Sequence, residues 1–263
     1  MSIKEEVLGK LGIMETKNLY PHEQVISHNL KRLKQAMLNI GQLVDPIVID
    51  KETSVVLDGN HRLKVLDIIE CPFAVCQLVD YNDPSITVGT WYPAIEKTPE
   101  EMGRLDHVKL EKVDEDEGKK AADELRAPFM LKYKEECYLI NPGQYKIMEM
   151  VEEQNYVLSL LEKNKVEYIA DQESELIIKE GKTVLFRRAY TKEEIKKAAL
   201  NHTPFPPKST RHNIPGRIIR LNMRLGWLHR SAEEAEREMK RNLSARLYEG
   251  NVRKYYEPVI VIY

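Results

Sequence analysis

The segment DGNHR, residues 58–62, separates an apolar run typical of a strand from an apolar pattern typical of a helix. A glycine at such a turn presents backbone N–H groups and the positive end of the helix dipole to an anion. Arg62 opposes that dipole and is better suited to grip a phosphate with two donors. Asp58 carries the carboxylate oxygen that Mg²⁺ prefers beside phosphates. The segment predicts a phosphate site, and the alternative is an ordinary turn with exposed His61 and Arg62.

Glu23 lies in the loop-like segment YPHEQV, residues 20–25, just before an expected helix. A carboxylate that stands among proline, histidine and glutamine in a loop can reach into a cleft and accept a proton there. The alternative is an exposed loop glutamate without a functional role.

A third polar cluster occupies the proline-bounded stretch PPKSTRHNIP, residues 206–215. A loop stiffened by proline loses little entropy when it grips a ligand, which favours a preorganised anion site. The loop can equally be a solvated basic segment or a phosphate contact to DNA. Trp91 and Tyr92 offer aromatic surface to a ligand, although buried core is the commoner place for such rings. The consecutive hydrogen-bond donors of the loop are Lys208, Ser209, Thr210, Arg211 and His212.

Together these clusters contain the parts that phosphoryl transfer requires. That reaction depends on positioning, on neutralising phosphate charge, and on a carboxylate that accepts the proton of the attacking hydroxyl. The sequence contains neither a GxxxxGK[ST] loop nor the motif set of the protein kinases, so neither of those kinase classes applies.

The patterns around residues 58–62 predict a compact α/β arrangement that positions the turn. A helix is expected from Ser27, as its N-cap, to a stop at Gly41. The stretch TVGTWYPAI, residues 87–95, is too aromatic and too interrupted by proline for an ordinary strand or helix. The other expected elements are strands at 47–50, 55–57 and 73–81, and a helix after Gly59 that ends at Cys71-Pro72.

From about residue 98 the composition shifts, and a second mixed part is expected. Residues 111–126 predict a charged, solvated helical stretch. Thr191 and Glu194 have the spacing of a capping box. Four prolines make regular structure over residues 203–217 unexpected. The remaining expected elements are helices at 145–163, 192 to about 202 and 231–247, and strands at 183–189 and 258–263.

The length of 263 residues fits one large domain or two smaller ones, and the net charge is −2. This near-neutral charge argues against a surface built to hold nucleic acid. Three cysteines, Cys71, Cys76 and Cys137, lack metal-ligand spacing, and an odd number suits a reducing compartment. No apolar run approaches the roughly 20 residues of a membrane span, so a cytoplasmic protein without a membrane partner is expected.

The sequence resembles the free L-serine kinases of the ParB/sulfiredoxin fold, and among them the archaeal ADP-dependent kind. DGNHR alone indicates only that fold, whereas the other segments together are specific to the kinase branch. The matching segments occur in the same order over roughly residues 20–213, and they are PHEQV, VVLDGNHRL, GTWYPA, RRAYTKEEI and PPKSTRH.

The resemblance implies phosphorylation of free L-serine to O-phospho-L-serine, a precursor for cysteine biosynthesis, with Mg²⁺ and with ADP or ATP as the donor. Glu23 would be the base that activates the serine hydroxyl, and Asp58 would assist at the phosphoryl centre or bind Mg²⁺. The implied phosphate-binding residues are Gly59, Asn60, His61, Arg62, Lys208 and Ser209. The implied serine-binding residues are Trp91, Thr210, Arg211 and His212, and Lys208 would also contact serine or the transferred phosphate.

The implied fold is α/β (α+β) in two domains. Residues 1–97 would form a ParB/sulfiredoxin-like nucleotide-binding domain. Residues 98–263 would form a second mixed α/β domain that contributes the KSTRH loop to the active-site cleft.

Two departures from the archaeal pattern bear on the donor nucleotide. Asn60 replaces a histidine of the archaeal motif, which affects any role specific to that imidazole. The chain also continues beyond TRHNIPGR, and its segment GRIIRLN is more similar to a bacterial ATP-using serine kinase from a siderophore pathway. ADP is favoured as the donor because the N-terminal motifs are closer to the archaeal type.

The competing function is a ParB-like DNA-binding regulator. The shared fold and the basic residues from Arg211 to Arg253 favour it, whereas the near-neutral charge and the lack of a convincing helix-turn-helix oppose it. Sulfiredoxin chemistry is disfavoured because it requires a cysteine where this chain has Asn60. A nucleotide hydrolase is disfavoured because it would give no purpose to Trp91 and the KSTRH loop. Free L-serine and a nucleotide are the expected partners, and the near-neutral charge disfavours nucleic acid.

Overall fold

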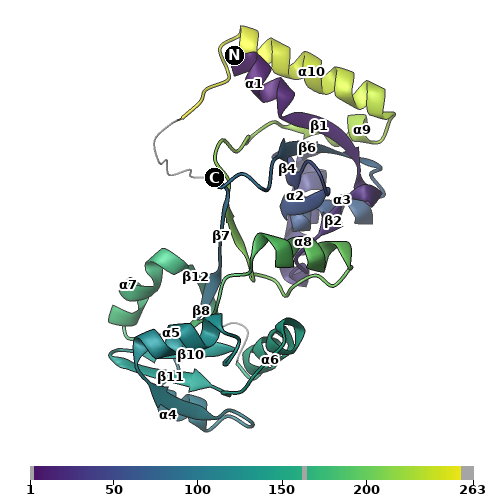
Figure 1. The fold of residues 1–263 in the computed structure, drawn as a ribbon. Coiled ribbons are helices and arrows are strands. Elements are labelled where there is room, and N and C mark those ends of the chain that lie inside the picture. The colour runs from purple at the N-terminus through teal and green to yellow at the C-terminus, as the bar shows by residue number, and fades with distance from the viewer. Residues whose placement is uncertain (1–2, 162–164, 256–263) are drawn as a thin grey trace. The chain divides into compact units, whose positions relative to one another are not determined.

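The computed structural model describes residues 3–161 and 165–255 (Figure 1). Contacts divide the described residues into two compact units. The first unit takes in those within Met1–Ser85, Ala199–Thr203 and Ile214–Tyr263. The second takes in those within Ile86–Ala198 and Pro204–Asn213.

The first unit is built on a mixed five-stranded sheet with the order β1-β6-β4-β5-β2. Strand β4 is buried along its whole length, as its apolar run requires of a strand covered on both faces. Parallel pairing of β2 with β5 aligns Tyr20 with Val55 and Pro21 with Val56. This register brings the chain just before Glu23 beside the strand that leads into DGNHR. The strands are β1 (Leu11–Glu15), β2 (Tyr20–Pro21), β4 (Ile47–Asp50), β5 (Val55–Asp58) and β6 (Phe73–Val79).

Helices bury their apolar faces in the core of the same unit. Helix α3 contributes Leu63, Val65 and Leu66, and α10 contributes residues from the far end of the chain, including Met239 and Leu243. Helix α10 lies beside α1 and contacts β1 (Figure 1). The helices are α1 (Ile3–Gly9), α2 (Ser27–Ile40), α3 (Asn60–Ile68), α9 (Leu225–Leu228) and α10 (Ala232–Tyr248), with a 3₁₀ turn at Thr16–Asn18 and the strand pair β3 (Gln42–Leu43) and β15 (Met223–Arg224).

The second unit is built on an antiparallel six-stranded sheet with the order β12-β8-β13-β10-β11-β9. A separate pair, β7 with β14, joins Thr87–Gly89 to Arg211–Asn213 in antiparallel register. The strands of the sheet are β8 (Trp91–Ile95), β9 (Leu110–Val113), β10 (Phe129–Tyr133), β11 (Glu136–Ile140), β12 (Glu167–Ala170) and β13 (Thr183–Phe186). The helices are α4 (Pro99–Gly103), α5 (Glu115–Asp123), α6 (Ile147–Ser159), α7 (Ser174–Lys179) and α8 (Lys192–Leu200), with a 3₁₀ turn at Asp171–Glu173.

Most of the predictions that depend on short stretches of sequence are confirmed. The strand, glycine turn and helix occur in the expected order, and α2 ends at Gly41 with the left-handed φ of +67°. Thr191 and Glu194 exchange the two hydrogen bonds of a capping box at 2.9 and 3.2 Å. Ser231 caps α10, the helix expected at 231–247, by accepting the N–H of Glu234. The prediction that Ser27 caps α2 is wrong, because Ile26 occupies the N-cap position and makes no side-chain cap bond.

Three stretches expected to be irregular or helical contain strands, although most of residues 111–126 is helical as predicted. TVGTWYPAI forms β7 and β8, and Pro93 fits in β8 because there β8 pairs only with Tyr168 of β12, and β13 joins from Ala94 onward. Within residues 203–217, Arg211–Asn213 lies between the prolines and forms β14. The charged stretch at 111–126 begins as strand β9 and becomes helical only at Glu115. The strand expected at 258–263 lies outside the described residues.

The division by contacts differs from the boundary at residues 97/98 that the composition suggests. Strand β8, Trp91–Ile95, pairs with β12 and β13 of the second unit. The described residues after Ile214 belong to the first unit, because α9 and α10 complete its core.

We expect Gly41→Ala to destabilise the first unit by about 1 kcal/mol, because alanine is strained at a positive φ even where space is available. A Cβ at Gly41 would meet no atom within 4 Å, so the cost is conformational. The matched control is Gly226→Ala in α9, where a Cβ also meets nothing and φ is not left-handed. Chemical denaturation of both variants measures the difference. Equal stabilities would contradict the assignment of the αL C-cap.

Candidate functional site

The turn between β5 and α3 requires a glycine. Gly59 is the N-cap of α3 with φ +104°, a conformation that residues with a Cβ rarely adopt. A Cβ there would also lie 3.1 Å from a terminal nitrogen of Arg62. The backbone therefore passes close above the guanidinium of Arg62 at the positive end of the helix dipole.

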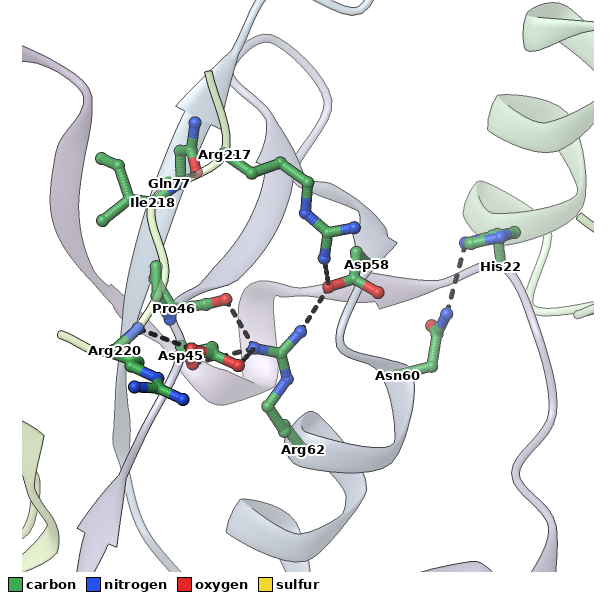
Figure 2. Close-up of polar contacts among 10 residues, drawn as sticks. All are labelled: His22, Asp45, Pro46, Asp58, Asn60, Arg62, Gln77, Arg217, Ile218 and Arg220. Carbon is green, nitrogen blue, oxygen red and sulfur yellow. Dashed lines mark hydrogen bonds and ion pairs between the residues drawn. The ribbon is translucent and has the colours of Figure 1, made fainter. Parts of the chain in front are cut away.

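Arg62 is held by protein groups, as Figure 2 shows. Its Nη1 donates to the carbonyl oxygens of Asp45 and Pro46 at 3.0 and 2.9 Å, and its Nη2 donates to Asp58. The side chain is only 16% exposed. Arg62 thus ties the start of α3 to the loop before β4, a role that its position in the sequence does not reveal.

Asp58 accepts hydrogen bonds from two guanidinium groups (Figure 2). One belongs to Arg62 and the other to Arg217, and both reach the same oxygen, Oδ2. Arg217 was missed by sequence reasoning, since it lies 159 residues further along the chain and only the tertiary fold brings it to the turn.

Asp58 in this arrangement does not fit a ligand of a resident Mg²⁺. Its Oδ2 already serves two cationic donors, which compete with a metal ion for the same charge. The described residues also contain no group of three or more His, Cys, Asp or Glu side chains placed to hold a metal.

Two histidines fix the loop that carries Glu23. The backbone N–H of Ile26 donates to Nε2 of His61 at 3.0 Å, so His61 ties the beginning of α2 to the DGNHR turn. His22 is 1% exposed, and its Nδ1 donates to the carbonyl of Val56 on β5. The carboxylate of Glu23 is consequently half-buried, with 15% of the side chain exposed, rather than a free loop group.

His22 is poised as a neutral ring beside Glu23. Burial lowers its pKa from the ordinary value, although the charge of Glu23 and the bond to Val56 oppose that shift. Its Nε2 lies 4.0 Å from Glu23 Oε1. Because burial favours the neutral imidazole, His22 holds the Glu23 loop through its hydrogen bond to Val56 and adds no positive charge beside the carboxylate.

Asn60 adds an unusual polar group to the turn. Its Nδ2 lies 3.5 Å from His22 Nδ1 (Figure 2), and its Oδ1 is buried without a hydrogen-bond partner among the described residues. A buried acceptor without a partner is costly in a folded protein, and such groups concentrate where a ligand or water completes them.

In the second unit Trp91 is flanked by two cations. The Nζ of Lys208 lies 4.7 Å from the ring centroid, and the guanidinium carbon of Arg211 lies 5.7 Å from it. Arg211 also pairs with Asp171 at 3.0 Å. The structure therefore places two of the predicted substrate- and phosphate-binding residues, Lys208 and Arg211, beside the ring of a third, Trp91.

The backbone of the KSTRH loop is held in a strained form by a buried arginine. Lys208 has a left-handed φ of +65°, which is costly for a residue with a side chain. Arg187, 3% exposed, donates to the carbonyl of Lys208 and to that of Trp91, as well as to the Thr90 hydroxyl at 3.1 Å. Sequence reasoning assigned Arg187 no role, although the pair of arginines that ends an apolar strand was a signal for it.

The remaining loop residues differ in exposure. Ser209 is fully buried, and its hydroxyl has no partner within the described part of the chain. Thr210 is buried, and His212 lies on β14 opposite Val88 of β7. Tyr92 packs against Phe186 with ring centroids 4.7 Å apart, so it belongs to the core.

None of the helices in the described ranges combines the length and apolar character that crossing a bilayer requires. All three cysteines are buried and free, and burial raises the pKa of each thiol, for Cys71 to about 11. Burial therefore disfavours the reactive thiolate form of each cysteine.

Comparison with known proteins finds distant relatives, while no protein-family model matches the chain. The ATP-dependent L-serine kinase of Staphylothermus marinus is 27% identical over 216 residues, which cover 77% of this chain and 85% of that protein. The ADP-dependent L-serine kinase of Thermococcus kodakarensis is 26% identical over 226 residues, with coverages of 81% and 90%. A ParB-like protein of Sulfolobus acidocaldarius is 27% identical over 223 residues, with coverages of 83% and 98%.

Solved structures agree with these relatives. A free serine kinase variant in complex with ADP superimposes with a TM-score of 0.70 at 26% identity, covering 83% of this chain and 94% of that one. SbnI of Staphylococcus aureus, truncated at its C-terminus, superimposes with a TM-score of 0.74 at 17% identity, covering 92% and 99%, and so shows a shared fold. The predicted mixed α/β fold is confirmed. The chain is a distant homologue of the nucleotide-binding free serine kinases and of a ParB-like protein.

Proposed function

We propose that this protein is a kinase that transfers a phosphoryl group from a nucleotide to the hydroxyl of free L-serine, forming O-phospho-L-serine. The observation that carries the proposal is the placement of Glu23. His61 and His22 hold its loop to the DGNHR turn, and the carboxylate is half-buried beside a neutral imidazole. A carboxylate next to an anion-binding helix N-terminus is the pairing that phosphoryl transfer to a hydroxyl needs.

The proposed roles follow from the surroundings of each residue. The first unit binds the nucleotide, whose phosphates lie over Gly59 and the first turn of α3. Asn60, with its open acceptor, takes a hydrogen bond from a bound hydroxyl or water. His61 positions the Glu23 loop, and Arg62 compensates Asp58 and shapes the turn.

In the second unit the proposed ligand is serine. Lys208 and Arg211 attract its carboxylate beside the Trp91 ring. The buried hydroxyl of Ser209 and the neighbouring Thr210 and His212 supply further polar contacts. Arg187 keeps the loop in its strained form and so preorganises it.

The proposed chemical step is a direct transfer of the phosphoryl group from the nucleotide to the serine hydroxyl. The serine oxygen attacks the terminal phosphorus of the donor as the bond from phosphorus to the nucleotide oxygen breaks. Glu23 takes the proton of the hydroxyl, and the shortened nucleotide leaves with the bonding electron pair.

The donor is ADP in our proposal, because the N-terminal motifs resemble the archaeal type more closely. Relatives of both kinds, ATP-dependent and ADP-dependent, match at similar identity. Incubation with Mg²⁺, L-serine and either nucleotide, followed by detection of O-phosphoserine, identifies the donor.

A ParB-like DNA-binding function is the second candidate, because one relative carries that description. Salt-sensitive binding to duplex DNA, with no O-phosphoserine from either nucleotide, would establish it in place of the kinase.

We expect Glu23→Gln to lower serine phosphorylation by about 10²- to 10⁴-fold, the usual contribution of a general base, while nucleotide affinity stays unchanged. Product formation and calorimetric nucleotide binding measure the two quantities. Glu236→Gln on the solvent side of α10 removes the same charge and is the control. A Glu23→Gln enzyme with wild-type turnover would exclude Glu23 as the base.

We expect Arg187→Lys to raise KM for serine at least about tenfold, because the compact ammonium lacks the planar fork whose Nε and Nη2 reach the Trp91 and Lys208 carbonyls, and hydrogen bonds of charged donors are strong. KM for the nucleotide should change little. The control is Arg188→Lys, at the adjacent arginine, which retains a cation for Glu194. Steady-state kinetics with each substrate varied in turn provides the test, and an unchanged KM for serine would contradict the role of Arg187.

A further inference from the structure

The segment from Gly216 to Asn222 is fixed to the first unit by successive backbone anchors. Gln77 of β6, 1% exposed, donates its Nε2 to the Gly216 carbonyl at 3.0 Å and accepts the Ile218 N–H on Oε1 at 2.8 Å. The N–H of Arg220 donates to Asp45 Oδ1 at 2.7 Å, and that of Asn222 donates to the Val44 carbonyl at 2.9 Å. These bonds locate the backbone of the residue between Gly216 and Ile218, which is Arg217.

Arg217 and Arg62 share Asp58 but differ in freedom. Arg62 is bound on three sides, since Nη1 serves two carbonyl oxygens and Nη2 serves Asp58. The guanidinium of Arg217 has a single contact in the described structure, to Asp58, and 40% of its side chain is exposed. Figure 2 shows it approaching Asp58 from the side opposite to Arg62. Only Arg217 can move without breaking the loop before β4.

The carboxylate of Asp58 does not need both arginines. If Arg217 leaves, Arg62 still pairs with Oδ2 and keeps the half-buried charge compensated. An anion that binds at Gly59 therefore has the Arg217 guanidinium nearby. Arg217 can leave Asp58 for the anion because Arg62 remains paired with that carboxylate. Exchanging a carboxylate for a phosphate also preserves the charge-assisted hydrogen bond of the guanidinium.

We propose that Arg217 is the exchangeable cation of the phosphate site: it moves from Asp58 to the terminal phosphate of the bound nucleotide, while Arg62 stays on Asp58. The inference rests on the proposed nucleotide site and assigns to Arg217 the phosphate contact that the sequence pattern assigned to Arg62. Asn60 lies on the same turn, and its buried Oδ1 has no hydrogen-bond partner among the described residues. A bound ligand at this end of α3 would supply that partner.

The test compares the dissociation constants of ADP, AMP and adenosine for the wild type and Arg217→Gln by calorimetry. We expect the variant to bind ADP at least about tenfold more weakly, because a charged hydrogen bond to phosphate is lost. Adenosine, which has no phosphate, should bind equally to both proteins. Equal loss for ADP and adenosine would overturn the proposal, because a general distortion of the turn would then explain the effect.

Arg220→Gln is the matched control, since it removes the same charge from the same segment, and its side chain points away from Asp58 (Figure 2). It should bind ADP as the wild type does. If Arg217→Gln proves unstable in thermal melting, Arg217→Lys replaces it, and retention of part of the ADP affinity with unchanged adenosine binding is expected. An Arg217→Lys protein with full ADP affinity would count against a phosphate contact through the guanidinium fork.

The outcomes separate this inference from the proposed function. A wild type that phosphorylates serine, together with an Arg217→Gln variant that binds ADP normally, overturns the inference alone. A wild type that binds ADP with the expected dependence on Arg217 but makes no O-phosphoserine overturns the kinase and supports the inference. A wild type without ADP affinity overturns both.

Discussion

The sharing of one carboxylate by two guanidinium groups is the interaction on which the first unit's functional end depends. Asp58 ends β5, Arg62 stands in the first turn of α3, and Arg217 comes from the segment after Ile214. Since Arg62 also holds the carbonyls of the loop before β4, the network joins four parts of the chain at one point. Ion pairs of this kind contribute little to stability when exposed. Their value here is geometric, because they fix which donors face the space above Gly59.

The second unit uses an arginine in a comparable way. Arg187 is buried and directs its donors at backbone carbonyls of two separate segments, whereas Arg62 binds two consecutive carbonyls of one loop in the first unit. Carbonyl oxygens carry no full negative charge, so these bonds do not neutralise the guanidinium groups, although Arg62 is paired with Asp58 as well. In both units, therefore, the side chain that positions a loop also places a cationic group beside it. Serine and nucleotide each carry an anionic group, which is consistent with the proposed division of ligands.

Sequence patterns predicted the parts of this architecture that are local. The strand, Gly59 turn and helix of the DGNHR segment, the stop of α2 at Gly41 and the capping box at Thr191 all depend on residues a few positions apart. The pairing of β7 with β14 joins segments far apart in the sequence, and no local pattern encodes it. For the same reason no sequence pattern points to Arg217, and the pattern that predicts a phosphate contact for Arg62 carries no sign of its carbonyl partners in the loop before β4. Pro93 misled because a proline is acceptable wherever a strand has a neighbour on one side only.

Gln77 has a consequence for how the chain can be shortened or extended. Its amide supplies one donor and one acceptor to the segment at Gly216–Ile218, and thereby replaces a strand partner with a single side chain. A glutamate in its place would lack the donor, and a leucine would lack both groups. A chain that ended before Gly216 would leave this amide buried with neither partner, at the full desolvation cost of both groups. Gln77 and the segment at Gly216, 139 residues further along the chain, therefore depend on each other. A truncation or a domain exchange that separates them would lose both hydrogen bonds.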